Sequence, residues 1–326
     1  MIEIRCDMRL LTLASVLTAC GPIPEVTQQS LVTDTHRRLS KLAQHASAQW
    51  LSDAERRVSL LGLAMQTVQL DGPPRFLSAP IEETPWYVQE YFSQVSAIDL
   101  GQHLAAIWQD ANLEEHFRAQ QPLWQEAEAD LASVFAGIGV DDFQEQFFGR
   151  FSSRLVAVPL ANKAIHGWRA VGVANQRETY AVFMSNKPYQ SHGIDLVGLA
   201  QHEASHPVLA DIQRLYPDIP TECAFVEQAY APANRFAREY GDSGYRWVET
   251  VIRTSTYFYL QSLGLSKEAE LYLRGEIESG VTAIEAYVKA LSPWWHERQR
   301  GNAAGLDGVL EELPSWLQGA VSDLGT

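Results

Sequence analysis

The chain has 326 residues, of which 46% are hydrophobic and 20% are charged. This length allows one large domain or two smaller ones, and the composition is that of a globular protein with a sizeable core. The formal net charge of −15 argues against nucleic acid or an anionic membrane surface as the main partner, because both require basic patches on the protein.

The first twenty residues resemble a bacterial lipoprotein signal. Met8 opens a short basic region, residues 10–18 are apolar, and Cys20 follows small residues as in a lipobox. The apolar stretch is far too short to span a membrane as a stable helix. We therefore predict a signal peptide over residues 1–19 and a lipid on Cys20. The alternative is an uncleaved apolar helix in which the cysteine has no such role.

The residues around Cys20 extend this prediction to a compartment. Residues 20–29 look like a short tether, and Gly21 and Pro22 place no aspartate after the cysteine. By resemblance to Gram-negative sorting signals, this predicts an outer-membrane lipoprotein that faces the periplasm. Only Cys223 would then remain in the mature domain, which predicts no internal disulfide.

The rest of the chain predicts an α+β fold that is mostly helical. Residues 30–145 show the 3.6-residue apolar spacing of helices. A small antiparallel sheet is predicted from three segments rich in β-formers, at residues 154–160, 168–174 and 179–185. The last of these strands is either an edge that pairs with an extended substrate or an ordinary strand with a covered edge. Helices are predicted again at residues 221–240, 243–263 and 266–291.

The pattern His-Glu-x-x-His at residues 202–206 is the strongest functional signal in the chain. On a helix, His202 and His206 share one face and can direct two imidazoles at one metal ion, for which zinc is suitable. Glu203 is badly angled for a ligand, but it can act as general base on a metal-bound water. The apolar run from Ile194 to Ala200 predicts that this helix is buried, although a helical histidine pair can also be purely structural.

A proline directly follows the second histidine of this pattern. Pro207 lacks a backbone N–H and disfavours helical geometry in the residue before it. We therefore expect the helix to kink or stop at His206, which would leave that histidine on a final, distorted turn.

A catalytic zinc site requires a third protein ligand and an open position for water. The downstream candidates are Glu222, Glu227 and Glu249, of which we favour Glu249. A single predicted helical face carries Tyr245, Glu249 and Arg253, each one turn apart. Arg253 could hold the Glu249 carboxylate, and Tyr245 could donate to the oxyanion of a tetrahedral intermediate. Alternatively, Glu249 and Arg253 form only a surface ion pair that contributes a few tenths of a kcal/mol.

These motifs resemble an uncharacterised bacterial group of gluzincin-type zinc metallopeptidases. The resemblance covers about residues 80–290. It is carried by Phe148-Gly149, the predicted strands, the 202–206 pattern, the later Glu249-x-x-x-Arg253 and the aromatic stretch from Trp86 to Phe92.

The resemblance implies a zincin-like catalytic part at residues 146–326 that follows a helical N-terminal part. The implied site consists of His202 and His206 as zinc ligands, Glu249 as third ligand and Glu203 as base. Two features depart from the family pattern. Ala204 takes the place of the usual aromatic residue, and Pro207 stands earlier than the proline of the family. Both departures concern the substrate and the helix geometry more than metal binding.

The predicted function is hydrolysis of peptide bonds in the cell envelope by a zinc-dependent metallopeptidase. Zinc and Tyr245, or alternatively His192 or Tyr230, would stabilise the oxyanion. The expected partners are a peptide or protein substrate and a membrane reached through the lipid on Cys20, not nucleic acid. The alternative is a catalytically idle periplasmic lipoprotein that acts as a binding or scaffold module. A carboxylate of Glu249 close to the histidine pair favours the enzyme, whereas a site filled by side chains favours the module.

Overall fold

A computed structural model of the chain describes residues 2–23, 30–78, 95–150, 153–165, 168–175, 178–185, 187–230 and 234–322. The contacts within it divide the chain into two compact units. Unit 1 comprises Met1–Ile138 and Ser153–Val197, and unit 2 comprises Gly139–Ser152 and Gly198–Thr326. The predicted boundary near residue 146 assigns the strands to the catalytic part, whereas the contacts group them with the N-terminal helices. The aromatic stretch from Trp86 to Phe92 lies outside the described residues.

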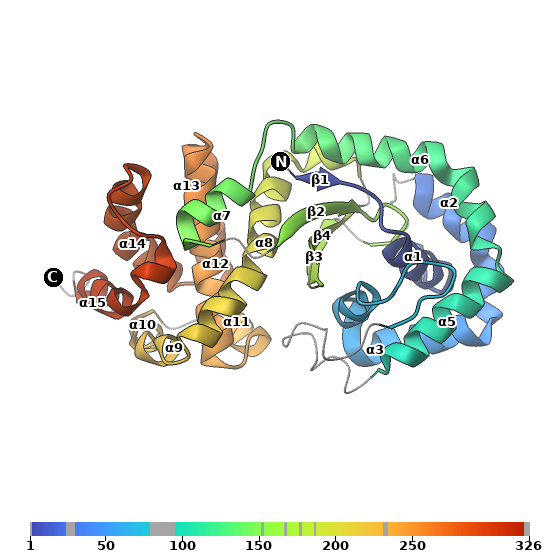
Figure 1. Cartoon of the computed structure of the whole chain (residues 1–326), viewed down its shortest axis with the longest axis horizontal. Coiled ribbons are helices and arrows are strands. Elements are labelled where there is room, and N and C mark those ends of the chain that lie inside the picture. Colours follow the sequence, from blue (N-terminus) through green and yellow to red (C-terminus); the bar gives the residue numbers. More distant parts are fainter. Residues whose placement is uncertain are drawn as a thin grey trace. The chain divides into compact units, whose positions relative to one another are not determined.

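The described residues form a mostly helical α+β fold, as predicted, and the sheet belongs to unit 1. The helical elements of unit 1 are α1 (Met8–Cys20), α2 (Ser30–Leu39), η1 (Ser40–Gln44), α3 (Ala46–Thr67), α5 (Ala97–Asp110), α6 (Leu113–Val134) and η4 (Tyr189–Ser191). Helix α6 contacts β1 and β2, and α3 contacts β3, so these helices cover the sheet (Figure 1).

The sheet is mixed rather than antiparallel. Within the described residues its strands lie in the order β1 (Glu3–Ile4), β2 (Arg154–Pro159), β4 (Glu178–Ser185), β3 (Trp168–Ala174). The β1–β2 and β2–β4 pairs are parallel, and the β3–β4 pair is antiparallel. The prediction of an antiparallel sheet is therefore wrong for two of these three pairs. The cause is non-local, because β1 comes from the N-terminal segment and β4 inserts between β2 and β3.

Strand β4 is internal to the sheet. Its residue Phe183 is aligned with Pro159 of β2 on one side and with Ala170 of β3 on the other. The suggestion that this strand is an edge available to a substrate is therefore wrong, because its backbone is already paired on both sides. Between β3 and β4, the Asn175 side-chain oxygen accepts a hydrogen bond of 3.0 Å from the Glu178 N–H.

Helix α1 lies in the core of unit 1. The side chains of its apolar residues Leu10, Leu11, Leu13, Val16 and Leu17 are at most 3% exposed.

Polar groups of α1 form hydrogen bonds with Asn162, which lies in the loop that follows β2. Asn162 Nδ2 donates to the carbonyl of Leu11 at 3.2 Å and to Ser15 Oγ at 2.6 Å. The Thr18 hydroxyl donates to the Asn162 carbonyl at 2.6 Å. Apolar packing and specific hydrogen bonds together fix the helix within the unit.

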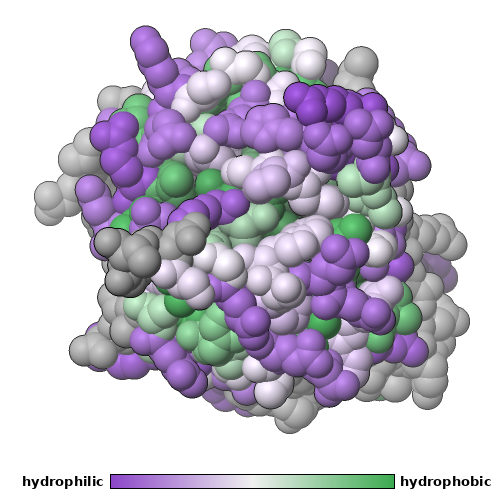
Figure 2. Space-filling view, turned by 90° about the vertical axis from the view of Figure 1, so that its left-hand side faces the viewer, coloured by the Kyte–Doolittle hydropathy of each residue, from purple (hydrophilic) through white to green (hydrophobic). Residues whose placement is uncertain are grey.

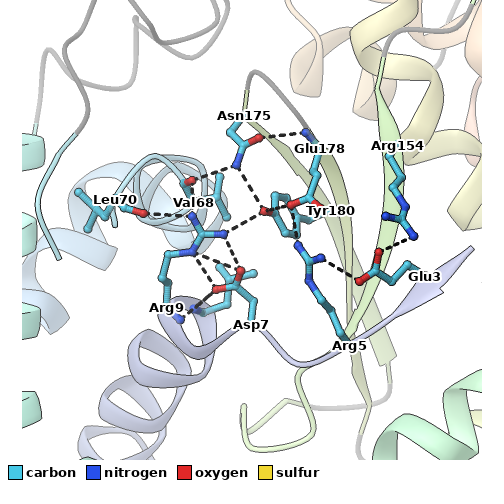
Figure 3. Close-up of polar contacts among 11 residues, drawn as sticks. Glu3, Arg5, Asp7, Arg9, Val68, Leu70, Arg154, Asn175, Glu178 and Tyr180 are labelled. Atoms are coloured by element: carbon cyan, nitrogen blue, oxygen red, sulfur yellow. Dashed lines mark hydrogen bonds and ion pairs between the residues drawn. The ribbon is translucent and has the colours of Figure 1, made fainter. Parts of the chain in front are cut away.

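Charged residues before α1 and in its first turn connect the same segment to the sheet through hydrogen bonds and ion pairs (Figure 3). Arg5 Nη2 donates to Glu178 at 2.6 Å, and Arg9 Nη2 donates to the Tyr180 hydroxyl at 2.9 Å. Asp7 accepts from Arg9 at 2.6 Å, and it also caps the first turn of α1. The segment predicted to be a signal peptide thus contributes an edge strand and a buried helix to unit 1.

Unit 2 is helical throughout its described residues. Its elements are α7 (Asp141–Phe148), the greater part of α8 (Gly193–Leu215), α9 (Ile219–Glu222), α10 (Phe225–Ala229), α11 (Asn234–Glu239), α12 (Ser243–Ser262), α13 (Ser266–Ser279), α14 (Ile284–Gln299), η5 (Leu306–Gly308), η6 (Leu310–Glu312) and α15 (Leu313–Ser322). Among the described residues, none of the helices combines the length and apolar composition needed to cross a membrane.

Two of the long helices predicted for this unit are broken. The predicted helix at residues 221–240 is replaced by α9, α10 and α11. The predicted helix at residues 266–291 ends at Ser279, because Gly280 adopts a φ of 108° in the left-handed region that terminates helices. The helix predicted at residues 243–263 is confirmed as α12.

An aromatic cluster forms the core of unit 2 where α7, α12 and α14 meet. The ring centroid of Phe147 lies 5.8 Å from that of Phe258, 5.2 Å from that of Trp294 and 5.3 Å from that of Trp295. Burial of these large rings holds α12 in place.

On the face shown in Figure 2, hydrophobic residues (green) occupy small areas between hydrophilic residues (purple).

Candidate metal centre

Helix α8 carries the His-Glu-x-x-His pattern in its middle. The ring centroids of His202 and His206 lie 5.1 Å apart, with the ring planes at 73°. The His202 side chain is 12% exposed and that of His206 is 37% exposed. One turn of helix therefore presents two imidazoles side by side, with solvent access on the His206 side.

Helix α8 does not stop at the proline. It continues to Leu215 with Pro207 in its interior, so of the two predicted outcomes, a kink or a stop at His206, the stop is wrong. Proline removes one backbone donor, which in a regular helix would bond to the carbonyl of Glu203. That single lost bond is tolerated because the helix is held by burial of Val208, Leu209 and Ile212, which are fully buried.

The Glu249 carboxylate of α12 reaches the histidine pair. Glu249 Oε2 lies 3.6 Å from His202 Nε2, and Glu249 Oε1 lies 3.7 Å from His206 Nε2. One donor atom from each of the three residues lies within 4.8 Å of the others. Donor atoms around a tetrahedral zinc ion with bonds of about 2.1 Å lie roughly 3.4 Å apart. Small side-chain movements would bring these three donors to that spacing.

Helices α8 and α12 meet at Gly198. A Cβ added to Gly198 would lie 3.4 Å from Thr256 Cγ2, which is van der Waals distance. Gly198 precedes His202 by one turn, and Thr256 follows Glu249 by two turns. The two helices therefore touch near the site, and a side chain larger than a methyl group at Gly198 would meet Thr256.

The buried hydroxyl groups of α12 are satisfied within the helix. Thr250, Thr254 and Thr256 each donate to the carbonyl four residues earlier, at 2.8 Å, 2.8 Å and 3.1 Å. These polar side chains can therefore lie in the core without leaving a donor unpaired.

Arg253 anchors the Glu249 carboxylate from the side. Arg253 Nη2 donates to Glu249 Oε2 and to the Tyr240 hydroxyl, each at 3.1 Å, and Arg253 Nη1 donates to Glu276 Oε2 at 2.9 Å. Burial by itself lowers the pKa of the Arg253 guanidinium, but the carboxylates of Glu276 and Glu249 raise it by more than burial lowers it. The net effect is a raised pKa, so Arg253 stays charged. The surface ion pair considered as the alternative does not apply, because the Glu249 side chain is only 9% exposed.

His202 is held in its neutral form. Burial lowers its pKa well below the ordinary value, and the positive charge of Arg253 and the neighbouring His206 lower it further. A neutral imidazole keeps a lone pair for a metal ion, so this environment suits a ligand.

Glu203 lies next to the site but is not one of the three converging residues. Its Oε2 is 3.8 Å from His206 Nε2, and its side chain is 11% exposed. This carboxylate is therefore positioned beside the centre, where a general base acting on a metal-bound water is required.

The remaining predicted residues lie in other surroundings. Neither alternative ligand belongs to the converging set found among the described residues. Glu227 accepts two hydrogen bonds of 2.8 Å from Arg246, and Glu222 is exposed. Tyr245 is 55% exposed, and His192 lies in unit 1 with its Nε2 at 2.8 Å from Ser185 Oγ.

Two residues that sequence reasoning missed belong to the surroundings of the site. Tyr240 and Glu276 both contact Arg253, from the end of α11 and from α13. Neither stands in a motif, and only the packing of three helices brings them together.

Comparison with known proteins finds no family model, no curated protein and no solved structure that matches this chain. The resemblance to gluzincin-type peptidases therefore stays a prediction.

Proposed function

We propose that unit 2 is a zinc-dependent metallopeptidase of gluzincin type. The observation that supports it is the convergence of two imidazoles and one carboxylate, which lie 3.6 Å and 3.7 Å apart across two helices. The set of one carboxylate and two imidazoles is one that catalytic zinc sites use. A purely structural ion cluster would not require a second glutamate, Glu203, beside the same histidine.

The residues that would hold the ion are His202, His206 and Glu249. When bound, zinc supplies Lewis acidity and lowers the pKa of a coordinated water toward neutrality. Glu203 would take the proton of that water and return it to the leaving amine of a peptide. Solvent reaches this centre on the side of His206, whose side chain is 37% exposed, so an extended substrate would approach there.

The test is a comparison of Glu203→Gln with the unaltered chain. Each purified protein is analysed for zinc per chain and for cleavage of a mixed library of quenched fluorescent peptides. We expect Glu203→Gln to keep its zinc and to lose at least about a hundredfold in rate, because it removes the base and not a ligand. Glu222→Gln, which makes the same charge change at an exposed position of unit 2, is expected to leave the rate unchanged.

Two outcomes would reject parts of this proposal. Unchanged hydrolysis by Glu203→Gln would remove this residue from the reaction. An unaltered chain that binds no zinc and cleaves no peptide would instead support the idle binding or scaffold module. The periplasmic location and the lipid on Cys20 stay predictions from the sequence.

A further inference from the structure

Arg253 is shared between two carboxylates that come from different helices. It donates to Glu249 on its own helix at 3.1 Å and to Glu276 on α13 at 2.9 Å. The three side chains are 16%, 9% and 14% exposed, so all of them lie largely out of water. The guanidinium carbon also lies 6.0 Å from the ring centroid of Phe236 and 5.9 Å from that of Tyr240. Arg253 is therefore held from three directions, and it has little freedom to follow Glu249.

The second carboxylate has an electrostatic consequence for the first. An arginine paired with Glu249 alone would neutralise the charge that this ligand offers to a cation. With Glu276 on the other side, the cluster of two glutamates and one arginine keeps a net charge of about −1. The Glu249 carboxylate can then be oriented by the guanidinium and still present negative charge to a divalent ion.

We propose that Glu276 is a positioning residue of the metal centre, which acts through Arg253 on the ligand Glu249. This inference rests on the proposed metal centre of His202, His206 and Glu249. Outer groups that orient a metal ligand commonly contribute ten- to a hundredfold in metal affinity. A residue far along the chain, on a helix with no motif, thus belongs to the site.

A structural ion pair between α12 and α13 would predict something different. In that case loss of Glu276 would lower the stability of the metal-free protein but leave the metal affinity of the folded protein unchanged. The measurement must therefore report on the metal and not only on folding.

The experiment compares Glu276→Gln, Glu276→Asp and the control Glu278→Gln. Glu278 lies on the same helix but is exposed, so its substitution makes the same charge change away from the site. Zinc affinity is measured by competition with a chromophoric chelator, and the visible spectrum of the Co²⁺-loaded protein reports the ligand geometry. Circular dichroism establishes that each variant is folded.

We expect Glu276→Gln to weaken zinc binding about tenfold and to shift the Co²⁺ bands, because the charge and the orientation of Glu249 both change. Glu276→Asp keeps the charge but shortens the side chain by one carbon, and it should lose less affinity. Glu278→Gln should bind as the unaltered chain does. Wild-type zinc affinity and an unchanged Co²⁺ spectrum in folded Glu276→Gln would overturn the proposal.

Two further outcomes also have a definite meaning for the proposal. If Glu276→Gln does not fold, Glu276→Asp is used alone, and wild-type affinity in this variant overturns the proposal whereas a measurable loss supports it. If the unaltered chain binds neither zinc nor Co²⁺, the metal centre itself is rejected and this inference with it. Failure of the inference alone is recognised by normal binding in the unaltered chain and in every variant.

Discussion

A carboxylate that binds a metal ion must be held in place while its charge remains available. Glu249 satisfies both conditions, because Arg253 donates to one of its oxygens at 3.1 Å while the two imidazoles lie at 3.6 Å and 3.7 Å. The alternative ligand Glu227 lacks this arrangement, since it forms an ion pair with Arg246. The difference between these glutamates is therefore one of surroundings and not of residue type.

A buried histidine of unit 1 predicts a pH dependence of stability. His116 is 8% exposed, and its Nε2 has no hydrogen-bond partner among the described residues. Burial lowers its pKa to about 4, although the carboxylate of Asp34 opposes this. The folded-state pKa lies below the unfolded value, so between pH 6.5 and 4 the unfolded chain binds a proton that the folded chain does not. Stability must therefore fall as the pH falls through this window.

The variant His116→Phe tests this expectation. Between pH 7 and pH 5, the free energy of unfolding of the unaltered chain should decrease by about 2 kcal/mol more than that of His116→Phe. Urea unfolding followed by circular dichroism at both pH values measures the difference. An identical pH dependence in both chains would show that this histidine is not held neutral by burial.

At the scale of the elements, the approach of α8 to α12 decides whether the site exists. Gly198 lies against Thr256, and a larger side chain there would push the two helices apart. We expect Gly198→Val to destabilise the protein by about 1–3 kcal/mol and to weaken zinc binding, because Glu249 would move away from the histidines.

The matched control for this substitution is Gly275→Val. Gly275 also lies within a helix, but a Cβ added there meets nothing within 4 Å. Thermal unfolding and chelator competition are measured for both variants. Equal zinc affinities in Gly198→Val and Gly275→Val would contradict the role given to the helix contact.

At the scale of the whole molecule, the N-terminal segment supplies β1 and α1 to unit 1. Cleavage before Cys20 would remove β1 and all but one residue of α1 from this unit. Loss of a buried leucine alone costs about 2–5 kcal/mol, and a domain has a total stability of about 5–15 kcal/mol. The loss of Leu10, Leu11 and Leu13 together would therefore unfold the unit.

We expect a chain that begins at Cys20 to lose the cooperative unfolding transition of unit 1, whereas full-length Cys20→Ala keeps it. Hydrogen exchange resolved by peptide measures this, with α3 and α6 as reporters. A truncated chain with native protection in these helices would show that the segment is dispensable. The mass of the protein isolated from a Gram-negative host then tells whether residues 1–19 are removed, as the signal-peptide prediction requires.

The amino-acid sequence by itself determined the local features of this protein. Helical periodicity places His202 one turn from His206 and Glu249 one turn from Arg253, because both relations depend only on residues four apart. The mostly helical α+β class likewise follows from local periodicity.

Only the tertiary structure decided the non-local features. The parallel pairing of β1 with β2, the burial of α1, and the contact of Glu276 with Arg253 join residues far apart in the chain. The apolar pattern of residues 10–18 is typical both of a signal peptide and of a core helix. The tertiary structure adds that these residues are buried and that Ser15 is hydrogen-bonded to Asn162. Periodicity indicates which face of an element is apolar, but the partner of that face is chosen by packing.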